Sequence, residues 1–203
     1  MRTFIRSCCA VLLLFGTLAA LGQTKEARDK YNKALKELDR RNFPKAEELL
    51  KKATAASSDW AAAQMLLGDV LFGEKKYAAA AEAYGQAHRA DDAKKQLSAD
   101  DRRNTLDQEG VSLAIDRKYD KALAVYLQAV KEDPEYPLYE YNYACVYSEM
   151  GDLDSALVHL KKAWALRANM PRGQAFPDPR QDSSFKRWLN DPRFQEAVAH
   201  MVI

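Results

Sequence analysis

The chain has 203 residues, of which 47% are hydrophobic and 30% are charged, so it is too apolar to be an intrinsically disordered protein. Its 31 basic and 29 acidic residues give a formal charge of +2, without the basic excess typical of proteins that bind nucleic acids or anionic membranes. The chain is rich in helix-forming residues and contains only eight glycines and seven prolines, which predicts an all-α fold.

Residues 1–22 are typical of a secretory signal peptide. Arg2 and Arg6 precede an apolar run from Ala10 to Leu21, and small residues lie just before the expected cleavage at Gln23. A membrane anchor is the alternative, but the run of about 12 residues is shorter than the roughly 20 residues that a spanning helix needs. We therefore expect a periplasmic or secreted protein with no stable membrane insertion after cleavage.

Cleavage at this position would change the charge and the cysteine content. The remaining chain has 29 basic and 29 acidic residues, so its formal charge is zero and no nucleic-acid partner is expected. Cys8 and Cys9 would be removed, which leaves Cys145 without a second cysteine for an internal disulfide. Packing is therefore expected to stabilise the mature protein.

Four segments share one pattern, in which a large apolar residue is followed three positions later by alanine. The large residues are Phe43, Tyr77, Tyr119 and Leu153, and the alanines are Ala46, Ala80, Ala122 and Ala156. Successive alanines are 34, 42 and 34 residues apart, so the middle interval contains eight extra residues near 95–102. Apolar or small residues follow each alanine at +4 and +7, which indicates one face of a helix.

A small residue lies 12 positions before each of these alanines. These small residues are Ala34, Gly68, Gly110 and Ala144. Two antiparallel helices approach closely only where at least one of them lacks bulk, so we expect each small residue to face the alanine of the following helix. Short polar turns such as Gly73–Lys76 would join the two helices into a hairpin.

These repeated features resemble the tetratricopeptide repeat family. The residues that carry the resemblance are Leu67, Gly68, Leu71, Tyr77, Ala80, Tyr84 and Ala87, and then Tyr143, Ala144, Tyr147, Gly151, Asp152, Ala156 and Ala163. The chain is identified as an exported bacterial member, which implies an all-α, right-handed α-solenoid of about four helical hairpins. Within a repeat domain at 23–170, we expect the repeats at about 27–60, 61–94, 103–136 and 137–170.

Two regions depart from the family pattern. Lys30, Lys33 and Glu37 replace apolar residues in the first helix of the first repeat, so that helix is expected to be a partly solvated cap. In the third repeat, Glu109 stands where leucine is usual, beside the insertion at 95–102. The insertion is either a helix that extends past Asp91-Asp92 or an ordinary surface loop.

Residues 171–203 are expected to form a non-helical crossover followed by capping helices. Prolines mark the crossover, and helical pieces are predicted at about 184–189 and 192–201, with Asp191 capping the second piece. Phe185, Trp188, Leu189, Phe194 and Val198 would cover the apolar face left open by the fourth repeat. The alternative is a tail that mimics a ligand of the repeats.

The sequence contains no recognisable catalytic or metal motif. His88, His159 and His200 lie in three different segments with no second ligand at metal spacing, and HExxH, CxxC, phosphate-loop and nucleophile-elbow patterns are absent. Cys145 lies on an apolar helix face, which is typical of a small buried hydrophobic residue. We therefore predict no enzymatic activity, no cofactor and no bound metal.

The resemblance implies that the first helices of the repeats line a concave surface that binds a peptide or protein segment. The matching residues are Tyr31, Leu35, Met65, Asp69, Phe72, Asp107, Val111, Tyr141 and Cys145. Positions used by some family members for a cationic clamp hold Tyr31, Leu35, Leu66, Asn104 and Gln108 instead. We therefore expect aromatic and aliphatic contacts, with Asp69 and Asp107 favouring basic residues, while packing between repeats is the alternative for Met65, Val111 and Cys145.

Three functional hypotheses follow from this surface. The first is a protein-interaction scaffold or adaptor of the cell envelope or a secreted compartment. The second is a chaperone-like or regulatory partner of one secreted client, and the third is a hydrolase with an unrecognised site. The partner and the oligomeric state are not predicted by the sequence.

Overall fold

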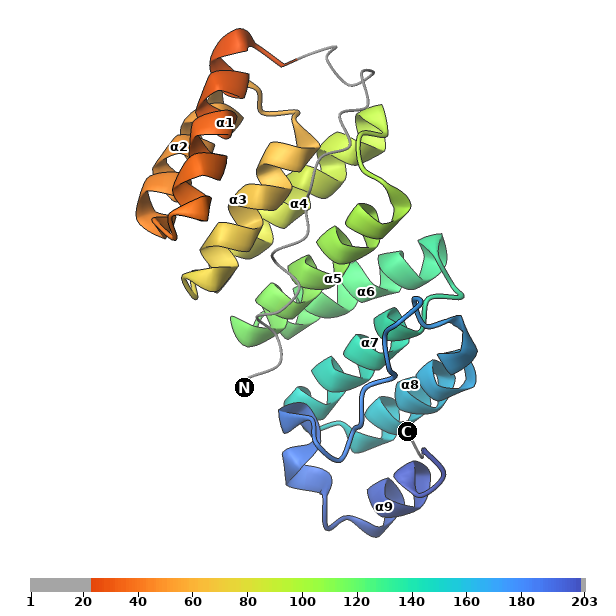
Figure 1. Ribbon diagram of the computed structural model, residues 1–203. Helices are drawn as coiled ribbons and strands as arrows, with labels where there is room; N and C mark the ends of the chain where they lie inside the picture. Colours follow the sequence, from red (N-terminus) through yellow and green to blue (C-terminus); the bar gives the residue numbers. More distant parts are fainter. Residues whose placement is uncertain (1–22, 202–203) are drawn as a thin grey trace.

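The computed structural model describes residues 23–201, and the signal peptide predicted at 1–22 lies outside the described residues. All regular secondary structure within 23–201 is helical. Four hairpins follow one another, formed by α1 Lys25–Asp39 with α2 Phe43–Ala56, α3 Ala61–Gly73 with α4 Tyr77–Lys94, α5 Ala99–Ile115 with α6 Tyr119–Glu132, and α7 Pro137–Met150 with α8 Leu153–Ala165. Figure 1 shows them stacked in a single row, which confirms the predicted all-α solenoid.

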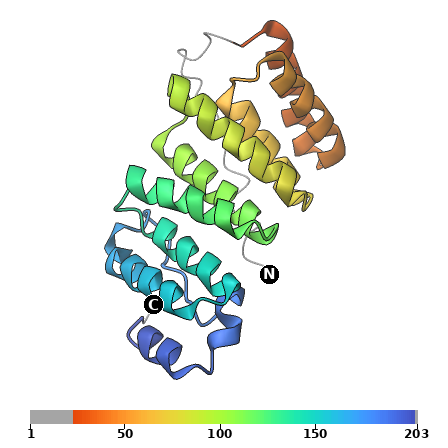
Figure 2. The ribbon, with the colours of Figure 1, turned by 180° about the vertical axis from the view of Figure 1, so that it is seen from behind.

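The first helices of the hairpins lie on one side of the row. In Figure 1, α1, α3 and α5 are turned toward the viewer, whereas α4 and α6 face the viewer in Figure 2. Each first helix packs against its own second helix. α3, α5 and α7 also pack against the second helix of the preceding hairpin, and α5 contacts α7. We call the surface formed by α1, α3, α5 and α7 the first-helix face.

A matched pair of residues sets the contact between the two helices of each hairpin. A Cβ atom on Gly68 would lie 2.6 Å from the Tyr84 ring, and a Cβ atom on Gly110 would lie 2.4 Å from the Tyr126 ring. Each glycine therefore makes room for a buried aromatic ring, where we had expected the alanine of the second helix. In the first and fourth hairpins the same two positions hold Ala34 with Leu50 and Ala144 with Leu160, all buried.

The turn inside each hairpin has one recurring backbone conformation. A residue with positive φ stands at the same position in all four turns, namely Arg41 (58°), Lys75 (61°), Arg117 (59°) and Gly151 (88°). In the second turn the Lys75 N–H donates to the Phe72 carbonyl at 2.9 Å, and the Lys76 N–H donates to the Leu71 carbonyl at 2.8 Å. This is the Schellman pattern, which satisfies the carbonyl groups at the end of a helix.

The eight extra residues near 95–102 lengthen two helices. α4 extends to Lys94 and α5 already begins at Ala99, so the insertion is mostly helix with a short turn between. The Asp91 carboxylate accepts the Leu97 N–H at 2.7 Å, and Ser98 caps α5 through its hydroxyl oxygen. Because of this cap, the third hairpin begins before residue 103, where we had expected the repeat to start.

Glu109 is accommodated by a glycine on the neighbouring helix. A Cβ atom on Gly85 would lie 2.8 Å from Glu109 Oε1 and 3.2 Å from Arg89 Nη1. The equivalent positions of the other second helices hold Lys51, Leu127 and Lys161. Gly85 therefore opens the space that lets a carboxylate stand where the family has leucine.

The residues after α8 fold back over the last hairpin. A short helix η1 Arg167–Asn169 leads into a non-helical crossover, which is followed by η2 Ser183–Trp188 and α9 Pro192–Val198. Asp191 caps α9 by accepting the Arg193 N–H, as expected. Figure 1 shows the crossover passing over the α7–α8 hairpin on the side of the first-helix face.

These C-terminal residues complete the core of the fourth hairpin. Phe185, Phe194 and Val198 are buried there, together with Phe176 and Met201, which we had not predicted. Trp188 is half-buried and packs against the same cluster. Leu189 is 37% exposed, so its predicted part in the cover was wrong.

Candidate protein-interaction surface

The predicted binding residues come from all four first helices. Tyr31 and Leu35 lie on α1, Met65, Asp69 and Phe72 on α3, Asp107 and Val111 on α5, and Tyr141 and Cys145 on α7. Leu35 and Asp69 are exposed, Tyr141 is buried, and the others are half-buried. The first-helix face is therefore part apolar and part acidic over its length.

The aromatic side chains of this face are held by neighbouring rings. Tyr31 lies with its ring centroid 4.6 Å from that of Trp60, and Phe72 meets Tyr77 edge-on at 5.3 Å. Tyr31, Met65 and Phe72 also pack against the core of the first two hairpins. Each of these side chains thus has one side fixed by packing and keeps another side at the surface.

Tyr141 is covered by the chain's own C-terminal segment. Its side chain is 2% exposed, its hydroxyl donates to Asp182 Oδ2 at 3.0 Å, and the rings of Phe176 and Phe185 pack edge-on against it. A partner cannot reach Tyr141 in this arrangement. The prediction that Tyr141 binds a partner is therefore wrong, because the fold of residues 171–191 could not be read from the repeat pattern.

Cys145 lies beside the same covering segment. Its Sγ is 3.9 Å from Asp182 Oδ2, and burial raises the pKa of the thiol well above its usual range, with the Asp182 charge acting in the same direction. A thiol that stays protonated is a poor nucleophile and a poor metal ligand. The structure thus supports the packing interpretation of Cys145.

Asp69 and Asp107 are the acidic residues of the open part of the face. Asp69 accepts a hydrogen bond from the Tyr84 hydroxyl at 2.8 Å, and the Asp107 carboxylate accepts one from the Asn142 side-chain amide. Burial raises the pKa of Asp107 to about 7, against the opposing effect of Asn142. Burial also raises the pKa of Asp69, although its side chain reaches solvent, which is typical of a carboxylate in a recess.

Gln108, which follows Asp107 in α5, has a side-chain acceptor that no donor from residues 23–201 meets. Its Oε1 atom is buried and has no hydrogen-bond partner among the described residues. Buried acceptors without donors are rare in folded proteins because desolvation is not compensated. The repeat pattern indicated Gln108 only as a position where a cationic clamp is missing.

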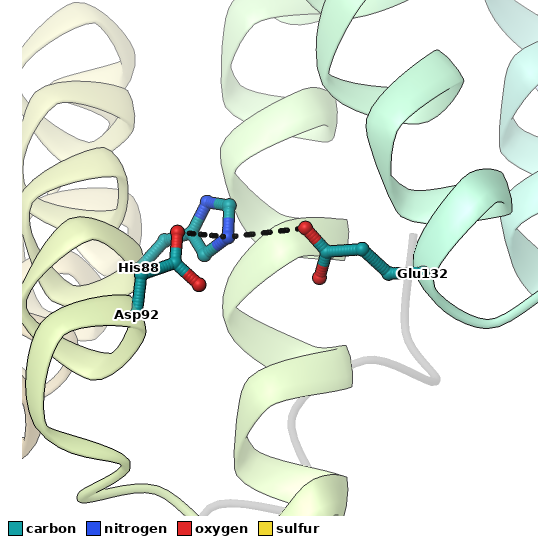
Figure 3. Close-up of side chains that lie close together, drawn as sticks. All are labelled: His88, Asp92 and Glu132. Carbon is teal, nitrogen blue, oxygen red and sulfur yellow. Dashed lines mark ion pairs between the residues drawn. The ribbon is translucent and has the colours of Figure 1, made fainter.

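A second polar cluster lies away from this face, where α4, α5 and α6 meet. His88 and Asp92 are one turn apart on α4 and lie close to Glu132 of α6 (Figure 3). The distances from His88 Nε2 are 3.3 Å to Asp92 Oδ2 and 3.7 Å to Glu132 Oε1. The prediction that His88 has no second ligand at metal spacing was therefore wrong. The i,i+4 spacing to Asp92 was visible in the sequence, but the approach of Glu132 depends on stacking of the hairpins.

An arginine already fills the cationic position in this cluster. Arg102 Nη2 lies 2.9 Å from His88 Nε2 and 2.6 Å from a carboxylate oxygen of both Asp92 and Glu132. Its Nη1 donates to the buried Asp91 carboxylate at 2.7 Å. Burial lowers the pKa of His88, and the Arg102 charge acts in the same direction. An uncharged His88 ring can therefore accept from Arg102. We interpret the cluster as an ion-pair network that joins the hairpins.

Comparisons with known proteins agree with the stacked hairpins. Two family models described as tetratricopeptide repeat match residues 31–95 and 141–169. The chain contains tetratricopeptide repeats. Its repeats support a role as a protein-interaction scaffold, and folds of this kind are typical of non-enzymatic interaction modules.

Solved structures of MamA share the fold of this chain. A structure of MamA MSR-1 is 21% identical with a TM-score of 0.58, and the match covers 70% of this chain and 78% of that one. Another MamA structure is 20% identical with a TM-score of 0.59, covering 70% and 79%. MamA from Desulfovibrio magneticus RS-1 is 17% identical with a TM-score of 0.58, covering 72% and 78%. At this level of identity the likeness concerns the fold alone.

Two further findings concern curated proteins and membrane-spanning helices. No curated protein matches the chain. Among residues 23–201, no helix combines the length and the apolar character that crossing a membrane requires.

Proposed function

We propose that the protein is a non-enzymatic scaffold that binds a peptide or protein segment of a partner on the first-helix face, with this face as its concave surface. The path of the chain's own C-terminal segment carries this proposal. Residues of the crossover and η2 lie along α7, where the Ser148 hydroxyl donates to the Ser184 carbonyl at 2.6 Å and Tyr141 donates to Asp182. The same face thus accommodates a polypeptide segment at one end.

The remainder of the face, over α1, α3 and α5, keeps binding groups at the surface. Exposed Leu35 and half-buried Met65, Phe72 and Val111 offer apolar contact area. Apolar side chains beside a few fixed polar groups are typical of surfaces that hold a peptide. We propose that the partner lies here, between α1 and the covered part of α7.

We also propose that the protein works in the periplasm or outside the cell, as an adaptor of an envelope or secreted complex. Arg2, Arg6 and the apolar run from Ala10 to Leu21 support export. A chaperone-like role toward one secreted client would use the same face and would give a single stoichiometric complex.

Site-specific photo-crosslinking in the producing cells tests the proposed face. A photoreactive amino acid at Val111 reports on the first-helix face, and one at the exposed Leu127 of α6 is the control on the opposite side. We expect mass spectrometry to identify one crosslinked polypeptide from position 111. The same polypeptide should be crosslinked from a photoreactive amino acid at position 65, and it should not be crosslinked from position 127. The same adducts from 111 and 127, or none from 111, would contradict the proposal.

A further inference from the structure

The open part of the first-helix face presents hydrogen-bond acceptors. Tyr84 and Asn142 each donate to one carboxylate oxygen, of Asp69 and Asp107 respectively. Gln108 Oε1 of α5 is buried and has no hydrogen-bond partner within residues 23–201. A partner with hydrogen-bond donors would therefore compensate the desolvation of these groups.

Arginines on the same helix do not neutralise these acids, because other carboxylates hold them. Arg102 is bound by Asp91, Asp92 and Glu132, and Arg103 Nε donates to Asp133 Oδ2 at 2.7 Å. Burial and, to a smaller degree, the Asp101 charge raise the pKa of Asp69, and burial raises the pKa of Asp107 to about 7. A cationic partner would favour the ionised form of both carboxyl groups.

The covered end of the face holds a further carboxyl group. Asp182 of the crossover lies over α7, bonded to the Tyr141 hydroxyl and to the Ser184 N–H. Carboxylates thus follow the face from α3 through α5 to the segment over α7. An acidic partner would be repelled along this path, whereas a basic side chain would meet charge-assisted acceptors.

From these contacts we propose that the face over α3 and α5 recognises an extended partner segment through arginine or lysine side chains, which donate to Asp69 or Asp107. The aliphatic stem of such a side chain would pack against Met65, Phe72 or Val111. This inference rests on the proposed function and names the chemistry of its partner.

Selection of random peptides displayed on phage, with the purified protein as bait, tests the inference. We expect the selected peptides to be enriched in arginine and lysine relative to the starting library. The affinity of one selected peptide should fall at least about tenfold for the Asp69→Asn/Asp107→Asn protein, because hydrogen bonds to charged groups are lost. The Asp120→Asn/Asp154→Asn protein loses the same charge from the second helices, and we expect it to bind as the unchanged protein does.

A second measurement keeps the test independent of the folding of the variant. Replacing the basic residue of the selected peptide by glutamine should weaken its binding to the unchanged protein by a similar factor. If the peptides lack basic residues, or if these changes have no effect while Val111→Arg still abolishes binding, the basic-partner inference is overturned and the proposed function stands. If Val111→Arg has no effect, or if no peptide is selected, the proposed function fails as well.

Discussion

At the scale of single residues, the packing of Gly68 against the Tyr84 ring decides how closely α3 and α4 approach. Gly68→Ala places a methyl group 2.6 Å from that ring and is expected to lower the free energy of unfolding by about 1–3 kcal/mol. The cost should be smaller in a Tyr84→Leu background, because hairpins one and four pair alanine with leucine at these positions. Chemical denaturation of the four proteins of this cycle measures the coupling.

Gly73 provides the control for this cycle. It ends α3 and has no atom within 4 Å of its would-be Cβ, so Gly73→Ala should leave the stability unchanged or raise it by up to about 1 kcal/mol. An equal cost of Gly68→Ala with tyrosine and with leucine at position 84 would show that the ring is not what excludes the methyl group.

The buried carboxyl of Asp107 makes stability depend on pH. Its folded pKa is about 7, above the ordinary value of 3.8, so the folded state binds the proton more tightly than the unfolded state between these values. The stabilisation is present at low pH and is lost as the pH rises through 7. Asp107→Asn cannot ionise and still offers an acceptor to Asn142, so its thermal midpoint should exceed that of the unchanged protein at pH 8 and approach it near pH 5.

The control for the pH dependence is Asp120→Asn, which changes an exposed carboxylate in the first turn of α6. The thermal midpoint of Asp120→Asn should differ little from that of the unchanged protein, and by the same amount at both pH values. Glu109 also has a pKa raised to about 7 by burial, so some pH dependence should remain in Asp107→Asn. If the difference in thermal midpoint between Asp107→Asn and the unchanged protein does not vary with pH, Asp107 does not have a raised pKa in the folded state.

At the scale of elements, the hairpin turns carry a conformational cost that the fourth turn avoids. Arg117 has φ of 59° where the fourth turn has Gly151, and an L-residue in this region loses roughly 1–2 kcal/mol. Arg117→Gly is therefore expected to raise the free energy of unfolding by about 0.5–1 kcal/mol in chemical denaturation. Lys118→Gly, at the next position with φ of −89°, should lower it. If Arg117→Gly lowered the free energy of unfolding and Lys118→Gly raised it, the left-handed backbone conformation of Arg117 would be contradicted.

The junction between the second and third hairpins depends on Arg102. Arg102→Met leaves the buried Asp91 without its ion-pair partner and is expected to lower the free energy of unfolding by about 3 kcal/mol. Arg193→Met, which removes an exposed pair with Asp154, should change it by less than about 1 kcal/mol.

Because Arg102 already lies among His88, Asp92 and Glu132, zinc should not raise the thermal midpoint of the unchanged protein. A zinc-dependent rise would favour a metal site over the ion-pair network.

At the scale of the whole molecule, the repeat spacing was sufficient to predict the solenoid. The residues that set it, such as Gly68 and Ala80, recur at a fixed interval and act between neighbouring helices, so their role can be read locally. The coverage of Tyr141 could not be predicted in this way, because Phe176 and Asp182 belong to no repeat and reach α7 through a non-helical crossover. The Arg102 network escaped prediction for a similar reason, since Glu132 approaches His88 only after the hairpins stack.

The candidate surface also depends partly on local positions in the repeats and partly on contacts between hairpins. The helical positions of Met65, Asp69 and Val111 followed from the repeat register. Which acceptors lack donors depends on contacts between hairpins, such as the one from Asn142 to Asp107, and these require the folded arrangement. The sequence therefore predicted the location of the surface better than its chemistry.

Crosslinking identifies the partner, and its affinity can then be measured for two matched variants. This measurement tests whether the first-helix face holds the partner. Val111→Arg places bulk and charge on the first-helix face, and Leu127→Arg places the same side chain on exposed α6. Calorimetric titration should show at least about a tenfold loss of affinity for Val111→Arg, corresponding to about 1.4 kcal/mol, and no change for Leu127→Arg. Unchanged affinity for Val111→Arg together with a loss for Leu127→Arg would contradict the claim that the first-helix face holds the partner.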